Sequence, residues 1–193
     1  AIIKNPEEDY SKDYFNRILH QLKNNHNYQN IFITGSDGKI YFTLDTSFVN
    51  VDSAAIRVFK KSYDQKKILI NDFYYCNTHN EIHLDFVSPI LDENQNPLAL
   101  LVFRIDPKDY LFPVIDEWPL PSSTGKSILL RVEDQNVIYL SPLLKKNDKL
   151  TFKNSLSETD FIAVKGALGK TGIVEGKAYN GKDYLADISL IDN

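Results

Sequence analysis

The segment from residue 86 to residue 121 restricts the possible folds more than any other part of the chain. Two strand-like runs, 82–91 and 98–105, are joined by a polar turn at 92–97, and a short proline-bounded run follows. This order predicts a long β-hairpin that leads into a short helix, after which a second strand-rich pattern begins. Such a layout suits the transmission of a small displacement from one domain to the next, and it is not the layout of an active site.

The bulk properties of the chain narrow the class of protein. Its 193 residues can form one large or two small domains with a buried core. The formal net charge of -4, with no run of Lys or Arg longer than a pair, argues against a nucleic-acid surface. Cys76 is the only cysteine, so no internal disulfide exists, and no apolar run approaches the roughly 18 residues of a membrane span. Because the chain lacks methionine and starts at Ala1, we expect a fragment of a longer gene product.

The first half of the sequence predicts an α+β domain built on an antiparallel sheet. A hairpin is expected around the turn at 35–38, and a second helix begins near Ser53. A long N-terminal helix is expected over 1–28, with an apolar stripe at Tyr10, Tyr14, Ile18 and Leu22. Three further strands are predicted at 68–75, 82–91 and 98–105. Strands that come in hairpins favour an α+β fold over a βαβ design.

The second half partly repeats this plan. Runs at 128–132 and 137–140 predict another hairpin, and the Ser-Glu-Thr-Asp sequence at 157–160 is typical of a capping box that opens a helix. Two last strands, 173–174 and 184–190, are expected to pair across a turn. The predicted order is therefore two strands, a helix and two strands, which is one strand fewer than in the first half. We expect the missing strand to be lost where the fragment ends.

Two runs of the sequence resemble a known family. The run from Arg104 to Ser122 reads RIDPxxYLFPxIxxWPxPS, and the run from Gly169 to Ala186 reads GKTGIVEGxxYxGxxYLA. Together they are similar to the double Cache (tandem PAS-like, PDC) sensor regions of membrane-bound histidine kinases, over residues 28–193. The resemblance implies two tandem PAS-like domains with antiparallel sheets. Its parts would be an N-terminal helix at 1–28, a membrane-distal ligand-binding domain at 29–106, a connector at 107–122 and a membrane-proximal domain at 123–193.

The resemblance implies a sensor and not an enzyme. It predicts the periplasmic or extracytoplasmic part of a membrane-anchored receptor that binds a small molecule, such as an organic acid or an amino acid, and needs no cofactor. The parent protein would be a two-component histidine kinase that forms a homodimer through the N-terminal helix. A diguanylate cyclase or a chemoreceptor could carry the same sensor region. A structural or protein-interaction module that binds no ligand is the alternative from another class of function.

In the resembled family, one face of the distal sheet forms a small ligand pocket. On the strand at 82–88, apolar residues alternate with His83 and Asp85, and the preceding strand carries Asp72 and Tyr74. These four polar residues are predicted ligand contacts, and Arg57 on the second helix could hold a carboxylate. The plainer alternatives are a solvated strand face and a surface arginine.

Other polar residues of the same region have simpler interpretations. Arg104 alternates with apolar neighbours, which predicts a structural residue paired with an acid. Cys76, His79 and His83 have a spacing that zinc could use, but no second pair of ligands lies elsewhere, so a polar loop is the favoured interpretation and we assign no metal. Ser88 cannot easily meet His83 across the strand, so no catalytic residue is assigned either.

Overall fold

The computed structural model describes residues 9–48, 50–109, 111–116, 125–141, 150 and 152–191, with side chains from residue 13 onward. The chain divides into two compact units, Ala1–Tyr110 and Leu111–Asn193. The α+β class with antiparallel sheets is confirmed. The division at residue 110 falls inside the predicted connector, and the finer domain scheme stays a prediction.

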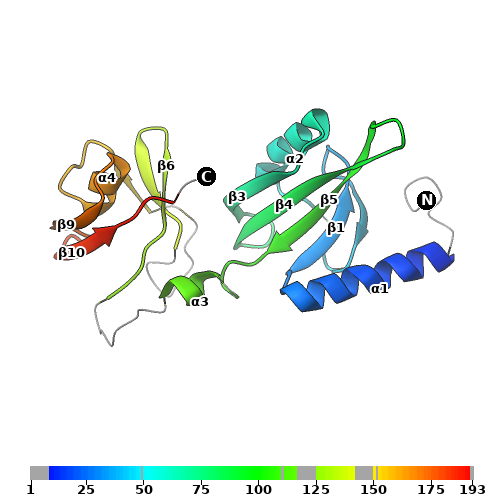
Figure 1. The fold of residues 1–193 in the computed structure, drawn as a ribbon, viewed down its shortest axis with the longest axis horizontal. Coiled ribbons are helices and arrows are strands. Elements are labelled where there is room, and N and C mark those ends of the chain that lie inside the picture. Colours follow the sequence, from blue (N-terminus) through cyan, green and yellow to red (C-terminus); the bar gives the residue numbers. More distant parts are fainter. Residues whose placement is uncertain are drawn as a thin grey trace. The chain divides into compact units, whose positions relative to one another are not determined.

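The first unit is a five-stranded antiparallel sheet with a helix on each face (Figure 1). The strand order is β2-β1-β5-β4-β3. The first strand in the sequence, β1, therefore lies beside the last one, β5, which is the central strand of the sheet. The strands are β1 (Asn30–Thr34), β2 (Ile40–Thr43), β3 (Leu69–Cys76), β4 (Glu81–Leu91) and β5 (Pro97–Ile105). The predicted hairpins β1–β2 and β4–β5 are both confirmed.

Helix α2 (Ser53–Gln65) covers one face of the sheet. It begins where predicted, because the Asp52 carboxylate caps it by accepting a hydrogen bond from the Ala54 amide at 2.9 Å. Ala55 and Phe59 of the helix are fully buried. The core that they join contains Phe32, Phe48, Tyr74, Cys76, Val87, Leu100 and Val102.

Helix α1 (Asp9–His26) covers the opposite face. Its Leu19 is 2% exposed, and its Phe15 ring lies 5.8 Å from the ring of Phe42 on β2. The predicted apolar stripe is wrong in detail, since Tyr14 is 53% exposed and the buried line is centred one position later, on Leu19. The predicted start of the helix lies outside the described residues. Among the described residues, no helix combines the length and apolar character needed to cross a membrane.

The second unit contains two small antiparallel sheets. After α3 (Leu111–Asp116), the sheet β6-β7-β8 comprises Leu130–Glu133, Asn136–Tyr139 and Lys153–Ser155. Helix α4 (Ile162–Ala167) precedes the hairpin of β9 (Gly172–Lys177) and β10 (Asp183–Ile188). Both predicted hairpins are confirmed. The unit has its own core of Val137, Tyr139, Ala163 and Val164.

Two predictions for the second unit are wrong. Strand β8 was not predicted, so the described part of this unit is not one strand short of the first unit. The 157–160 segment does not cap α4, which begins at Ile162 after Phe161 without a side-chain cap. The reason is that Phe161 forms a β-bridge with Lys177, and the Lys177 amide donates to the Asp160 carbonyl at 2.9 Å. These contacts hold Phe161 in an extended conformation and delay the helix.

Asp52 is predicted to stabilise the first unit through both carboxylate oxygens. Besides capping α2, it accepts hydrogen bonds from the amides of Asn77 and Thr78, at 2.9 and 3.4 Å. We expect Asp52→Ala to lower the free energy of unfolding by about 1–2 kcal/mol in chemical denaturation. Ser53→Ala, at the exposed neighbour, is the control and should change it by less than about 0.5 kcal/mol. Equal losses for the two variants would contradict this role.

Candidate functional site

A row of buried polar side chains crosses four strands of the first unit. Asn71 on β3 lies opposite Asp85 on β4, and Asp85 lies opposite Arg104 on β5. Arg104 in turn lies opposite Asn30 on β1. Directly opposed residues project to the same face of a sheet, and these four side chains are only 6, 0, 2 and 3% exposed. Because buried polar groups are costly unless they are partnered, this row is the first place to look for a site.

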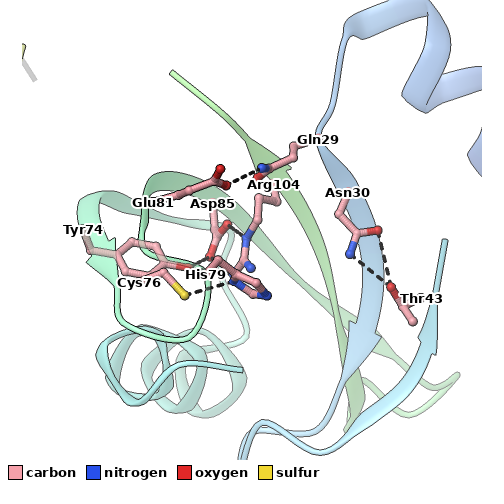
Figure 2. Close-up of polar contacts among 9 residues, drawn as sticks. All are labelled: Gln29, Asn30, Thr43, Tyr74, Cys76, His79, Glu81, Asp85 and Arg104. Atoms are coloured by element: carbon pink, nitrogen blue, oxygen red, sulfur yellow. Dashed lines mark hydrogen bonds and ion pairs between the residues drawn. The ribbon is translucent and has the colours of Figure 1, made fainter. Parts of the chain in front are cut away.

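Arg104 is the centre of the row (Figure 2). Its Nε donates to Asp85 Oδ1 at 2.9 Å, and its Nη2 donates to Asp85 Oδ2 at 3.1 Å. Nη2 also donates to the Tyr74 hydroxyl at 2.7 Å, and that hydroxyl donates to Asp85 Oδ2 at 2.6 Å. The three side chains therefore form a closed network, in which both oxygens of Asp85 already accept. The acid partner predicted for Arg104 is thus Asp85.

Two aromatic rings hold the guanidinium of Arg104 in place. Its central carbon lies 5.2 Å from the ring centroid of Phe32 and 4.8 Å from that of Phe48. Cations at this distance from aromatic faces are stabilised, the more so when they are desolvated. The Nη1 atom, however, is buried and has no hydrogen-bond partner among the described residues. The Arg104 side chain is thus held in place, and its Nη1 atom is free to donate to a further acceptor.

Burial and the ion pair fix the charges of the network. Burial opposes the charge of Arg104, but the nearby Asp85 carboxylate outweighs it and raises the pKa of Arg104. Burial, followed by the charge of Asp85, raises the pKa of Tyr74 well above its usual range. Arg104 is therefore a cation and Tyr74 a neutral hydrogen-bond donor at any physiological pH.

Three metal-ligating side chains lie beside this network. Cys76 ends β3, His83 lies on β4, and His79 lies in the turn between them. Cys76 Sγ is 3.1 Å from His79 Nδ1, and one ligand atom from each of the three residues lies within 4.8 Å of the others. His83 is 1% exposed, and neither of its ring nitrogens has a hydrogen-bond partner among the described residues. Their spacing in the sequence was compatible with a zinc site, although a polar loop was the favoured interpretation, and the structure brings the three together.

The surroundings keep these three groups neutral. Burial, and then the charge of Arg104, lowers the pKa of His83 to about 3. The same two causes lower the pKa of His79, and burial raises the pKa of the Cys76 thiol. A neutral imidazole presents a free lone pair, which is the form that accepts a hydrogen bond or binds a metal.

The structure brings together three of the five predicted ligand contacts. Tyr74, His83 and Asp85 are buried on the α2 face, so the solvated-face interpretation of β4 is wrong. Asp72 is exposed, as is Arg57 on α2, so neither lies in the buried cluster. A register shift between Asn71 and Tyr74 explains the position of Asp72. Regular alternation would have placed Asp72 beside Tyr74, but the bulge puts Asn71 on that face instead.

Two important residues escaped the sequence analysis. Asn71 is 6% exposed with its Nδ2 donor unpartnered, and Phe48 stacks on Arg104 from the loop between β2 and α2. The polar Asn71 in a strand was the available indication, although its face depends on the bulge. Phe48 gave no indication, since an aromatic residue in a loop has no periodicity from which a contact could be inferred.

The second unit offers a weaker candidate. An open depression is lined by Ser157, Glu158, Thr159, Asp160 and Phe161, which are consecutive residues of a single segment. The first four are exposed, and nothing from another element adds a buried polar group. The depression therefore lacks the convergence of separate elements that a binding site needs.

The chain has little detectable similarity to known proteins. No protein-family model matches it, and no curated protein does. Among solved structures, it is similar to the crystal structure of the sensor domain of the V. cholerae histidine kinase DctB. The TM-score is 0.42 and the sequence identity 12%, over 76% of this chain and 74% of that one. These values are too low to assign a function, so the family that the sequence resembles stays a prediction.

Breaking the Arg104–Asp85 pair is predicted to be strongly destabilising. Asp85→Leu or Arg104→Met alone should lower the free energy of unfolding by about 3–5 kcal/mol, because each leaves a buried charge uncompensated. The double variant should lose less than the sum of the two, with a coupling of at least about 1 kcal/mol in chemical denaturation.

The exposed pair of Arg131 and Glu133 on β6 provides the matched control. Its Nη2–Oε1 distance is 3.1 Å, and Glu133→Gln should change the free energy of unfolding by less than about 1 kcal/mol. Strictly additive losses at Arg104 and Asp85 would show that the two side chains do not depend on each other, contrary to the structure.

Proposed function

We propose that this chain is the extracytoplasmic sensor region of a membrane-anchored receptor, and that its first unit binds a small organic acid. The runs at 104–122 and 169–186 support the receptor class through their resemblance to double Cache regions. The buried network of Tyr74, Asp85 and Arg104 supports the location of the ligand. The Cys76–His79 contact places a thiol beside an imidazole, but burial raises the pKa of that thiol, and the proposal assigns no catalysis to the first unit.

The unpartnered Nη1 atom of Arg104 carries the proposal. Nη1 is buried and has no acceptor among the described residues, which lowers the stability of the fold. This loss of free energy is larger than the net gain from an ordinary hydrogen bond. A carboxylate oxygen is a suitable acceptor, because a hydrogen bond between a guanidinium nitrogen and a carboxylate is stronger than one between neutral groups. Asn71 Nδ2, on the same face, is a second buried donor without a partner.

The available groups favour an organic acid over an amino acid. An amino acid needs acceptors for its ammonium group, and Arg104 and Tyr74 already use three of the roughly four lone-pair positions of Asp85. The unpartnered groups of the row are donors. Asp72 and Arg57, which are exposed, are proposed only as contacts at the rim of the site.

Two loops would have to separate for a ligand to enter. Phe48 covers Arg104 from the β2–α2 loop, and its ring lies 5.3 Å from that of His79 in the β3–β4 turn. Asp52 ties the two loops through its contacts with the Asn77 and Thr78 amides. We propose that a bound carboxylate stabilises the closed arrangement of these loops.

Arg104 lies only a few residues before the predicted connector at 107–122, so a displacement of its backbone can reach the connector directly. Arg104 is the next-to-last residue of β5, and the chain enters the proline-bounded segment at Pro107. A ligand that binds one arrangement of β5 more tightly shifts the population toward it, and this difference in affinity is the signal. The parent would be a histidine kinase dimerised through the N-terminal helix, with a cyclase or a chemoreceptor as alternatives.

One observation favours a purely structural module instead. Tyr74, Asp85 and two of the three guanidinium nitrogens of Arg104 satisfy one another, as in a core that needs no ligand. A ligand-binding module and a structural module differ in what they predict for a variant that lacks Nη1. In a structural module, such a variant changes the free energy of unfolding and nothing else.

The proposal is tested by binding of small carboxylates to the chain. Calorimetry with a panel of mono- and dicarboxylates should show saturable binding by at least one of them. Thermal unfolding should shift upward, since ligand at a hundred times its Kd adds about 2.7 kcal/mol of stability. Arg104→Lys keeps the charge but loses Nη1, and it should weaken binding by about tenfold or more.

Arg17→Lys is the matched control, because it makes the same change at an exposed arginine of α1, on the opposite face of the sheet. It should leave the affinity unchanged within about twofold. Circular dichroism must show that both variants are folded. Loss of binding in Arg17→Lys but not in Arg104→Lys, or a panel that gives no binding at all, would contradict the proposed site.

A further inference from the structure

We propose that Cys76, His79 and His83 form a metal-binding site, and that Zn²⁺ is the ion that suits it. The site uses other atoms than the proposed carboxylate site and does not depend on that function. Thiolate sulfur and imidazole nitrogen are the donors that Zn²⁺ prefers in proteins.

The geometry is close to that of a bound site. In a tetrahedral zinc site with Zn–S near 2.3 Å and Zn–N near 2.0 Å, neighbouring ligand atoms lie roughly 3.3–3.6 Å apart. Here Cys76 Sγ and His79 Nδ1 are 3.1 Å apart, and all three ligand atoms lie within 4.8 Å of one another. Small side-chain rotations would therefore bring all three to bonding distance of one ion. Figure 2 shows the Cys76 sulfur directed at the His79 ring.

A hydrogen bond between Cys76 and His79 explains only part of this arrangement. A thiol that donates to Nδ1 satisfies those two side chains, but it leaves both nitrogens of His83 without a partner at 1% exposure. The His83 ring packs edge-on against His79, with centroids 5.5 Å apart. An ion held between the rings gives His83 a partner, which no described residue does.

The charges around the site act in both directions. The charge of Arg104 lowers the pKa of His79 and His83, although the ion pair with Asp85 at 2.9 Å offsets part of that charge. The carboxylates of Glu81, Asp45 and Asp52 act against this lowering at His79, and so favour a positive charge beside it. A metal ion would also displace the proton of Cys76, so the bound thiolate would offset part of the ion's charge.

The three protein ligands leave one tetrahedral position for a further ligand. Closed structural zinc sites have four protein ligands, whereas sites that bind a small molecule keep one position open. His79 is half-buried in a turn, which gives the ion a route from solvent. The site therefore fits an exchangeable ion more closely than a permanent structural one.

Cobalt substitution tests the site with a specific readout. Because Cys76 is the only cysteine, a thiolate-to-cobalt charge-transfer band can arise from this site alone. Titration of the reduced, metal-free chain with Co²⁺ should produce this band together with visible bands of tetrahedral cobalt, saturating at one ion per chain. Zn²⁺ should displace the Co²⁺ and abolish both. Absence of the bands in excess Co²⁺ would overturn the proposal.

Variants then assign the ligands. Cys76→Ser should abolish the charge-transfer band, and His79→Gln or His83→Gln should each weaken Co²⁺ binding at least about a hundredfold. Of the three variants, His79→Gln should disturb the fold least, since His79 lies in a turn and is only half-buried. His20→Gln with His26→Gln removes the other two histidines, both exposed on α1, and should change nothing. Full cobalt binding in both His79→Gln and His83→Gln, or its loss in the α1 control, would overturn the assignment.

Discussion

The buried ion pair between Arg104 and Asp85 is the interaction on which the first unit depends. Two charges can be held out of water only if their geometry is good and their remaining hydrogen-bonding groups are occupied. Here the pair joins neighbouring strands, Tyr74 adds a third strand, and two phenylalanine rings stack on the cation. A slip of one residue between β4 and β5 would put Arg104 and Asp85 on opposite faces of the sheet, so the pair fixes the register as well as the core.

Function is proposed where this network is left incomplete. Buried polar groups in native proteins nearly always have partners, so exceptions call for an explanation. Among the described residues, four of the six buried side-chain atoms without a hydrogen-bond partner lie on the α2 face: Nη1 of Arg104, Nδ2 of Asn71 and both nitrogens of His83. The first two are donors and suit an anion, whereas neutral His83 beside Cys76 and His79 suits a metal ion. These two proposals use different atoms, and each has its own test.

Local regularities were predictable from the sequence where short-range chemistry decides the structure. Turn residues and alternating apolar residues identified the hairpins of both units, and α2 begins at Ser53, where a helix was predicted. The prediction failed where a distant contact overrides local preference. The Phe161–Lys177 bridge delays α4, and β8 forms because it pairs with β7. A three-residue strand has no periodicity that would reveal it.

The candidate site shows the same division. The sequence alone determined that polar residues alternate with apolar ones on β4, and that Arg104 among apolar neighbours needs an acid. It could not show that Asn71 faces inward and Asp72 outward, because a single bulge between β3 and β4 reverses the alternation. Nor could it show that Cys76, His79 and His83 converge, since their distances depend on how the turn folds back over the sheet. Side-chain period is a property of one strand, whereas register and bulges are set by packing between strands, and only the tertiary structure contains that information.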